Sequence, residues 1–145
     1  MNSAQLPPSF ASAVAYVDGG CFPNPGRAGW AAVVITPTDT RELWGTEEHS
    51  TNQRAELLAA IAALEVLDEP TAVEIVSDSM YLVMCGRGEW RRKANLDLWA
   101  RLRKVAVHHR VTYTWVRGHA GNPGNERAHE LAMYAISGED IGGAA

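Results

Sequence analysis

Three acidic residues occupy positions from which their carboxylates could act together. Asp18 and Asp78 each directly follow a short apolar run, and Glu56 falls in the first turn of an Ala-, Leu- and Glu-rich segment over 54–67. Because the functional crevice of an open α/β sheet lies at the carboxyl ends of its parallel strands, Asp18 and Asp78 should converge there. One such acid alone is commonly a helix cap or a solvated charge. Three clustered carboxylates repel one another and predict a site for a hard cation, Mg²⁺ or Mn²⁺.

Apolar periodicity and turn residues divide the chain into the elements that must position these acids. Strands are predicted over 13–17, 29–36, 41–49, 72–77 and 111–116. Helices are predicted over 54–67, 79–85, 96–107 and around Ala128, Leu131, Ala132 and Ala135. Strand–helix–strand connections favour parallel neighbours, and the short link 37–40 favours a hairpin. We therefore expect an α/β fold with a mixed five-stranded sheet, strands 1–3 antiparallel and strands 4–5 parallel to strand 1, flanked by helices.

Length and composition indicate one globular domain. The chain has 145 residues, of which 46% are hydrophobic and 21% are charged, as in ordinary globular proteins. We expect the domain over 13–136, with flexible tails at 1–12 and 137–145. No apolar run is long enough for a membrane span, and no secretory signal is recognisable. Two cysteines, Cys21 and Cys85, cannot form a disulfide framework, so we expect a reduced, cytoplasmic protein.

Positive charge is concentrated in one part of the chain. The net charge is −4, yet ten of the 13 Lys and Arg residues lie between Gly86 and Arg127, with only three acids among them. Such asymmetry indicates a basic face for a polyanion beside an acidic region that holds cations. Randomly distributed surface charge is the alternative explanation.

Six groups of residues, in order along nearly the whole domain, resemble the type 1 ribonuclease H family. They are YVDGG at 16–20 with NPG at 24–26, TNQRAEL at 51–57, VSDS at 76–79 with Tyr81, NLDLW at 95–99, WVRGHAG at 115–121, and NER at 125–127 running into ELA at 130–132. The resemblance implies a ribonuclease H-like fold. It also implies a phosphodiester hydrolase that cleaves the RNA strand of RNA–DNA hybrids internally, with two metal ions, and leaves 5′-phosphates.

The resemblance also implies roles for individual residues. Asp18 would bridge both ions, Glu56 and Asp78 would help to hold them, and His119 would aid proton transfer or product release. Contacts to RNA 2′-hydroxyls would come from Gly19, Gly20 and Cys21. Contacts across the minor groove would come from Asn24, Asn52 and Gln53. A DNA-phosphate pocket would be lined by Thr51, Asn52 and Asn95. Capping and turn formation are alternative roles for these asparagines.

The sequence departs from the family pattern at His129. Relatives usually place an Asp there as a fourth carboxylate. A neutral imidazole at His129 would be a metal ligand better suited to Mn²⁺ than to Mg²⁺. Alternatively, the second ion is held through water, or Glu126, one helical turn earlier, replaces the missing carboxylate. Glu130 lies further round the helix and is a less suitable replacement.

A second departure lies between 87 and 95. Some relatives carry an extra basic helix here. The segment between Trp90 and Asn95 of this chain has too few residues to form it. A short basic loop with Arg87, Arg91, Arg92 and Lys93 would replace it in part through phosphate contacts, or it is an ordinary solvated loop.

We therefore expect a metal-dependent ribonuclease H, monomeric and with no obligate protein partner, that acts on RNA–DNA hybrids. One alternative is a hybrid-binding domain whose catalysis is weakened by His129. Another is a related nuclease that acts on duplex DNA, against which the predicted 2′-hydroxyl contacts argue.

Overall fold

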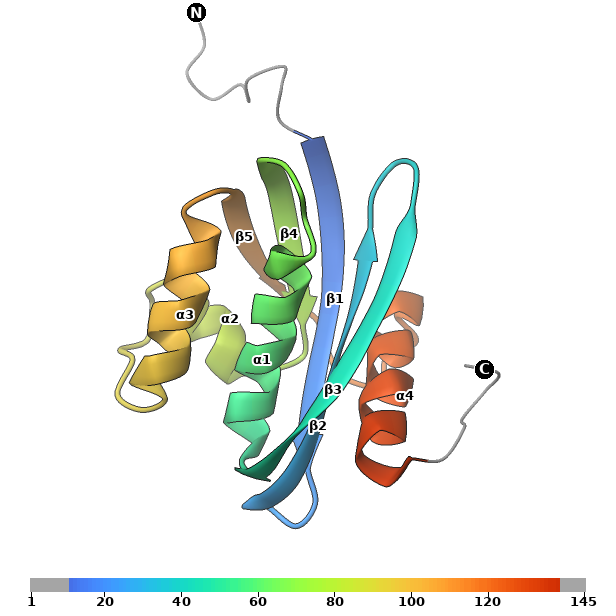
Figure 1. Ribbon diagram of the computed structural model, residues 1–145, viewed down its shortest axis with the longest axis vertical. Coiled ribbons are helices and arrows are strands. Elements are labelled where there is room, and N and C mark those ends of the chain that lie inside the picture. The colour runs from blue at the N-terminus through green and yellow to red at the C-terminus, as the bar shows by residue number, and fades with distance from the viewer. Residues whose placement is uncertain (1–10, 139–145) are drawn as a thin grey trace, which may run out of the picture.

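A computed structural model describes residues 11–138 (Figure 1). Along the chain the elements are β1 (Ala11–Cys21), β2 (Gly26–Ile35), β3 (Thr40–Ser50), α1 (Asn52–Glu65), β4 (Thr71–Ser77), α2 (Met80–Gly86), α3 (Leu96–Ala106), β5 (Arg110–Trp115) and α4 (Pro123–Ser137). The predicted order of strands and helices is confirmed. Residues 11 and 12 of the predicted N-terminal tail belong to β1, and residue 137 of the C-terminal tail ends α4. The other tail residues, except Gly138, lie outside the described part.

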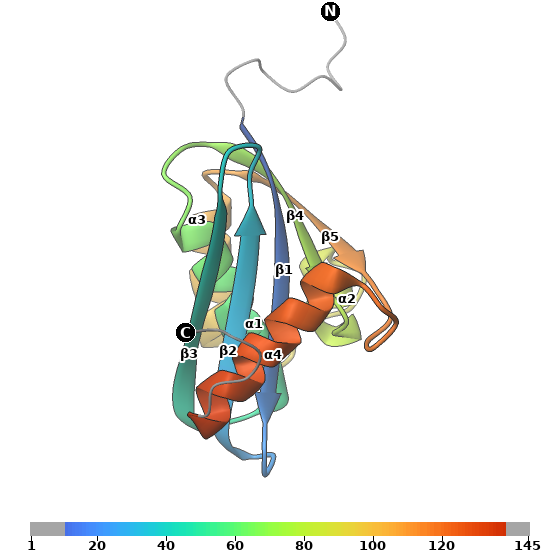
Figure 2. The same cartoon turned by 90° about the vertical axis from the view of Figure 1, so that its right-hand side faces the viewer.

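The five strands form one mixed sheet in the order β3-β2-β1-β4-β5. Strand β2 pairs antiparallel with β1 and with β3, whereas β4 pairs parallel with β1 and with β5. This arrangement confirms the predicted fold. Helices α1 and α3 cover one face of the sheet and α4 crosses the other (Figures 1 and 2).

The main core lies between the sheet and α1. Alternate residues of β1 face it, and Leu57, Ile61 and Leu64 of α1 are almost completely buried against them. Burying each of these side chains stabilises the fold by roughly 1.5–3 kcal/mol. A smaller cluster on the opposite face packs Ala128 and Leu131 of α4 against β2. No helix within residues 11–138 is long and apolar enough to span a membrane.

The prediction that the first strand ends before Asp18 is wrong. Strand β1 continues to Cys21 because residues 18–21 pair with residues 28–31 of β2, which begins earlier than expected. Its parallel pairing with β4 nevertheless stops at Tyr16 and Val76. Asp18 therefore still lies at the carboxyl edge of the parallel pair, although it is inside a strand.

Helix α1 also begins earlier than predicted. Thr51 has extended backbone angles, and its hydroxyl accepts a hydrogen bond from the Arg54 backbone N–H at 3.2 Å, which makes it the N-cap. Glu56 therefore lies in the second turn of the helix, one turn deeper than expected, where it is 7% exposed.

Candidate active site

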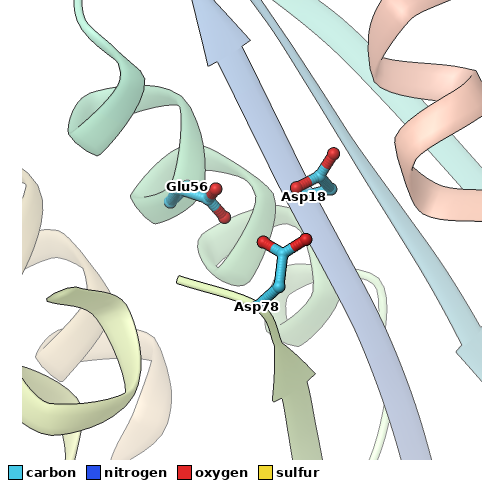
Figure 3. Close-up of side chains that lie close together, drawn as sticks. All are labelled: Asp18, Glu56 and Asp78. Atoms are coloured by element: carbon cyan, nitrogen blue, oxygen red, sulfur yellow. The ribbon is translucent and has the colours of Figure 1, made fainter. Parts of the chain in front are cut away.

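The three predicted carboxylates converge at the carboxyl edge of β4. One oxygen from each of Asp18, Glu56 and Asp78 lies within 4.8 Å of the others. They come from three separate elements, since Asp18 belongs to β1, Glu56 to α1, and Asp78 follows the end of β4 (Figure 3). Asp18 and Glu56 are buried, and Asp78 is half-buried. Such a cluster of hard oxygen donors suits a divalent cation.

Gly19 allows this convergence. A Cβ atom built on Gly19 would lie 2.5 Å from the carbonyl carbon of Ala55 and 2.7 Å from the backbone nitrogen of Glu56. Both distances are too short for any side chain. The glycine therefore lets α1 approach β1 closely enough to bring Glu56 beside Asp18.

The electrostatics of the cluster are those of crowded acids. Burial raises the pKa of Glu56 well above its usual value of 4.5, and the charges of Asp18 and Asp78 raise it further. Burial and the Asp18 charge likewise raise the pKa of Asp78, although a hydrogen bond from Asn125 opposes this shift. The neighbouring negative charges therefore disfavour ionisation of Glu56 and Asp78, and a bound cation would reverse that effect.

The cluster also contains an unpaired atom. Oε1 of Glu56 is buried and has no hydrogen-bond partner within the described residues. A buried polar oxygen without a partner costs free energy, and it belongs to a carboxyl group that lies beside those of Asp18 and Asp78. The donor set and this orphan oxygen both fit a site for Mg²⁺ or Mn²⁺.

Two histidines lie at the edge of the cluster. Nδ1 of His129 is 3.0 Å from Oδ2 of Asp18, and this hydrogen bond is the main reason why the pKa of His129 is raised above 6.5. The rings of His119 and His129 pack edge to face, with their centroids 4.9 Å apart. His119 is exposed, has a left-handed backbone with φ of 54°, and lines the same cavity as the three acids.

Most of the predicted site residues share one cavity of about 200 Å³. It is lined by all five predicted catalytic residues and by three predicted substrate residues: Asp18, Glu56, Asp78, His119, His129, Gly19, Gly20 and Asn52. Five predicted substrate residues do not line it, namely Cys21, Asn24, Thr51, Gln53 and Asn95. Glu126, the possible substitute for a fourth acid, is also absent from the lining, and its carboxylate accepts from the Gly121 N–H at 3.3 Å.

Three of the predicted substrate residues form a hydrogen-bonded chain beside the cavity. The backbone N–H of Cys21 donates to Oδ1 of Asn52 at 2.7 Å, and the Asn52 N–H donates to Oδ1 of Asn24 at 3.2 Å. The Cys21 side chain is buried and its thiol lies 3.4 Å from the carbonyl of Ser50. Cys21 therefore offers only backbone to a ligand, while Gln53 is exposed at the start of α1.

Asn95 is held by aromatic side chains. It adopts φ of 58° at the N-cap of α3 and makes no side-chain cap of that helix. Its amide instead donates to the Tyr81 hydroxyl at 3.1 Å, which also accepts from the Trp99 indole at 2.9 Å. Arg54 bridges Glu47 on β3 and Asp97 on α3, each at 3.0 Å. Together these contacts fix the position of α3 relative to Thr51 and Asn52.

The structure adds Asn125 to the site. It is 2% exposed, its amide nitrogen lies 3.5 Å from Oδ2 of Asp78, and its Oδ1 has no partner within the described residues. Sequence reasoning placed Asn125 in a motif without assigning it a contact. Its spacing was a usable signal, because residues four apart on a helix share a face and His129 follows at that distance.

The four cations of the predicted basic loop are not equivalent. Arg91 and Lys93 are exposed, but Arg92 folds inward over the Trp99 ring, with its guanidinium carbon 4.2 Å from the ring centroid. Arg87 donates to the Tyr113 carbonyl at 2.9 Å and pairs loosely with Glu89. Arg91 and Lys93 are therefore the two loop cations whose side chains make no hydrogen bond or ion pair with the described residues.

Comparison with known sequences gives one consistent result. The sequence model of the RNase H family matches residues 11–137. A ribonuclease H from Nitrosococcus oceani is 44% identical, with 84% of this chain and 92% of the relative covered. Ribonuclease HI of Pseudomonas aeruginosa strain PAO1 is also 44% identical, with coverage of 86% and 93%.

Solved structures agree. The N-terminal RNase H domain of a Mycobacterium tuberculosis protein, solved as a fusion with maltose binding protein, has a TM-score of 0.80 at 30% identity and covers 88% of this chain and 95% of its own. LC11-RNase H1 in complex with an RNA/DNA hybrid has a TM-score of 0.73 at 26% identity, with coverage of 86% and 96%.

Proposed function

The chain belongs to the RNase H family, and from this premise we propose that it hydrolyses the RNA strand of RNA–DNA hybrids internally, leaving 5′-phosphates. The observation that carries the proposal is the convergence of the Asp18, Glu56 and Asp78 oxygens within 4.8 Å. A protein that only bound nucleic acid would gain nothing from three crowded, partly desolvated carboxylates. Their mutual repulsion is a cost that a cation-dependent reaction explains.

Asp18, Glu56 and Asp78 would hold the metal, with Asp18 bridging two ions of Mg²⁺ or Mn²⁺ when substrate is bound. The ions would lower the pKa of a water molecule and neutralise charge that develops on the leaving 3′ oxygen. The buried, unpaired Oε1 of Glu56 supports this role. Asn125 orients the Asp78 carboxylate by donating to Oδ2.

The two histidines would handle protons and orientation. His129 holds Oδ2 of Asp18 through Nδ1, which fixes the orientation of a carboxylate that would hold the metal. His119 stands exposed against the His129 ring, where one of its ring nitrogens would carry a proton to or from the scissile phosphate or the departing product.

The hybrid would be recognised beside this cavity. Gly19 and Gly20 line the cavity with bare backbone, which suits close approach to RNA 2′-hydroxyls, the groups that distinguish RNA from DNA. Cys21 would add to the 2′-hydroxyl contacts through its backbone, and Asn24, Asn52 and Gln53 would contact the hybrid across the minor groove. The DNA strand would lie against Thr51, Asn52 and Asn95.

One observation favours a second candidate function. The His129 imidazole stands where relatives usually place a carboxylate, and it forms a hydrogen bond with Oδ2 of Asp18. The metal site would then be weaker, and the protein would be a hybrid-binding domain with little catalytic activity.

We further propose that the protein is monomeric and cytoplasmic. Its two buried free thiols, Cys21 and Cys85, suit a reducing compartment.

The decisive experiment is a gel assay with end-labelled RNA–DNA hybrid, duplex RNA and duplex DNA, each with Mg²⁺, Mn²⁺ or a chelator. We expect internal cuts in the RNA strand of the hybrid only, and none with the chelator. Hybrid binding without cleavage in either metal would support the binding domain instead. Cleavage of duplex DNA would overturn both candidates.

A further inference from the structure

A second cavity lies at the β5 edge of the sheet. It has a volume of about 330 Å³, within the range of small-molecule sites, and its lining residues come from the end of α2, from the loop that follows it, from α3 and from β5. Its polar and aromatic lining consists of Arg92, Trp99, Arg103 and Tyr113. It shares no lining residue with the carboxylate cavity, so its chemistry is separate. We call it the edge cleft.

Arg92 is fixed in the edge cleft without a counter-ion. Its Nε donates to the carbonyl of Cys85 at 3.1 Å, and its guanidinium lies on the Trp99 ring. Within residues 11–138 it forms no ion pair, and neither Nη group makes a hydrogen bond. A half-buried guanidinium is normally paired, because burial of an unpaired charge is costly.

Arg103 adds a second cation to the same cleft. It is exposed on α3 and, like Arg92, has no ion pair among the described residues. No acidic side chain lines the edge cleft. Two arginines line this cavity and no carboxylate does, so its lining carries a net positive charge that favours an anion.

Tyr113 supplies a neutral donor. Its ring lies against Gly86, where an added Cβ would sit 2.7 Å from Cζ, and its hydroxyl makes no hydrogen bond within the described residues. Burial raises the pKa of Tyr113 to about 12, so the hydroxyl stays protonated. The edge cleft therefore holds two cations and one unused O–H donor.

We propose that the edge cleft binds a phosphate group, which accepts hydrogen bonds from Arg92, Arg103 and the Tyr113 hydroxyl. Planar guanidinium groups match the oxygen spacing of phosphate, and two positive charges balance a phosphate dianion. The phosphate would belong either to a nucleic-acid backbone that extends beyond the active site or to a free phosphate compound. Both sources require the same three donors.

The test is a titration of the full chain with inorganic phosphate, followed by NMR of the Arg92 Nε–Hε and Trp99 indole signals, against chloride at matched ionic strength. We expect saturable shifts with a Kd on the order of 1 mM. Arg103→Gln and Tyr113→Phe should each weaken binding about tenfold. The matched control is Lys104→Gln, which removes the adjacent exposed charge outside the edge cleft and should leave the Kd unchanged.

Hybrid kinetics distinguish the two sources. A nucleic-acid phosphate predicts that Arg103→Gln raises KM for a long hybrid and Lys104→Gln does not, whereas a free phosphate compound predicts the same KM for both. Absence of saturable shifts, or equal binding by wild type, Arg103→Gln and Tyr113→Phe, would overturn the proposal. Because phosphate binding is measured without cleavage, this result is independent of the proposed catalytic function.

Discussion

Nδ1 of His129 on α4 lies 3.0 Å from Oδ2 of Asp18 on the central strand β1. A fourth carboxylate at this position would repel Asp18, whereas the imidazole forms a hydrogen bond with it and its pKa rises in consequence. The cavity therefore carries less negative charge than one with four acids. This difference should determine which metal the site prefers.

We expect Asp18→Asn to abolish cleavage while hybrid binding persists, because Asp18 would bridge both ions. A loss of about 1,000-fold corresponds to roughly 4 kcal/mol of barrier. Single-turnover cleavage and hybrid affinity should be measured together. The control is Asp39→Asn, which makes the same change at an exposed position. Cleavage within about tenfold of wild type, roughly 1.4 kcal/mol, would contradict the assignment.

His129→Asp should improve Mg²⁺-supported cleavage, by about tenfold, and narrow the preference for Mn²⁺. The physical reason is that a carboxylate supplies a negative charge and a hard oxygen, which imidazole lacks. His129→Ala should lower activity in Mn²⁺. Metal titrations of the three proteins at fixed pH and salt test both expectations. Full activity of His129→Ala in both metals would leave the fourth position to Glu126 or water.

Glu56→Gln should stabilise the metal-free protein, increasingly so as pH rises above 4.5. The pKa of Glu56 is raised in the folded state, so folded protein binds this proton more tightly than unfolded protein and loses stability as pH rises through the folded pKa. Gln removes that loss. Thermal unfolding of both proteins between pH 5 and 8, with and without Mg²⁺, measures this difference in stability. Mg²⁺ should raise the Tm of wild type more than that of Glu56→Gln.

Glu65→Gln is the matched control for that experiment, because it makes the same change on α1 at an exposed residue paired with Arg101. Its stability relative to wild type should hardly change across the pH range. If Glu56→Gln were less stable than wild type at pH 8 without metal, repulsion would not dominate the carboxylate cluster.

Gly19→Ala should destabilise the fold by about 1–3 kcal/mol and reduce cleavage, since its methyl group would force α1 away from β1. At Gly20 the added Cβ would lie 3.1 Å from the exposed Phe22 ring and 3.8 Å from Cδ1 of Ile136, so it would meet side chains and no backbone. Gly20→Ala should therefore stay within about 0.5 kcal/mol of wild type. Denaturant unfolding decides this point, and equal stability of the two variants would show that the approach at Gly19 is not tight.

Neutralising Arg91 and Lys93 together should raise KM for the hybrid and reduce the slope of log affinity against log salt by up to about two, with kcat unchanged. Arg92 is left unchanged in this variant because it lines the edge cleft, which is tested separately. The control is Arg41→Gln with Arg101→Gln, which removes two exposed charges on other elements. An unchanged salt slope would mean that this loop does not touch nucleic acid.

Local sequence patterns determined the order of strands and helices, the parallel pairing of β4 with β1, and the three acids Asp18, Glu56 and Asp78. The reason is that apolar periodicity, turn residues and strand–helix–strand connections act over a few residues or a single crossover. These patterns predict which residues lie near the same edge of the sheet. They do not predict the distances between the side chains of those residues.

Only the tertiary structure placed Asp18 inside a strand, because that strand is extended by antiparallel pairing with β2. It also brought His129 to Asp18 across 111 residues of sequence, added Asn125 beside Asp78, and turned Arg92 away from its loop neighbours onto Trp99. Each of these contacts depends on how closely separate elements pack. That packing arises from side-chain shape across the whole core, which no local pattern records.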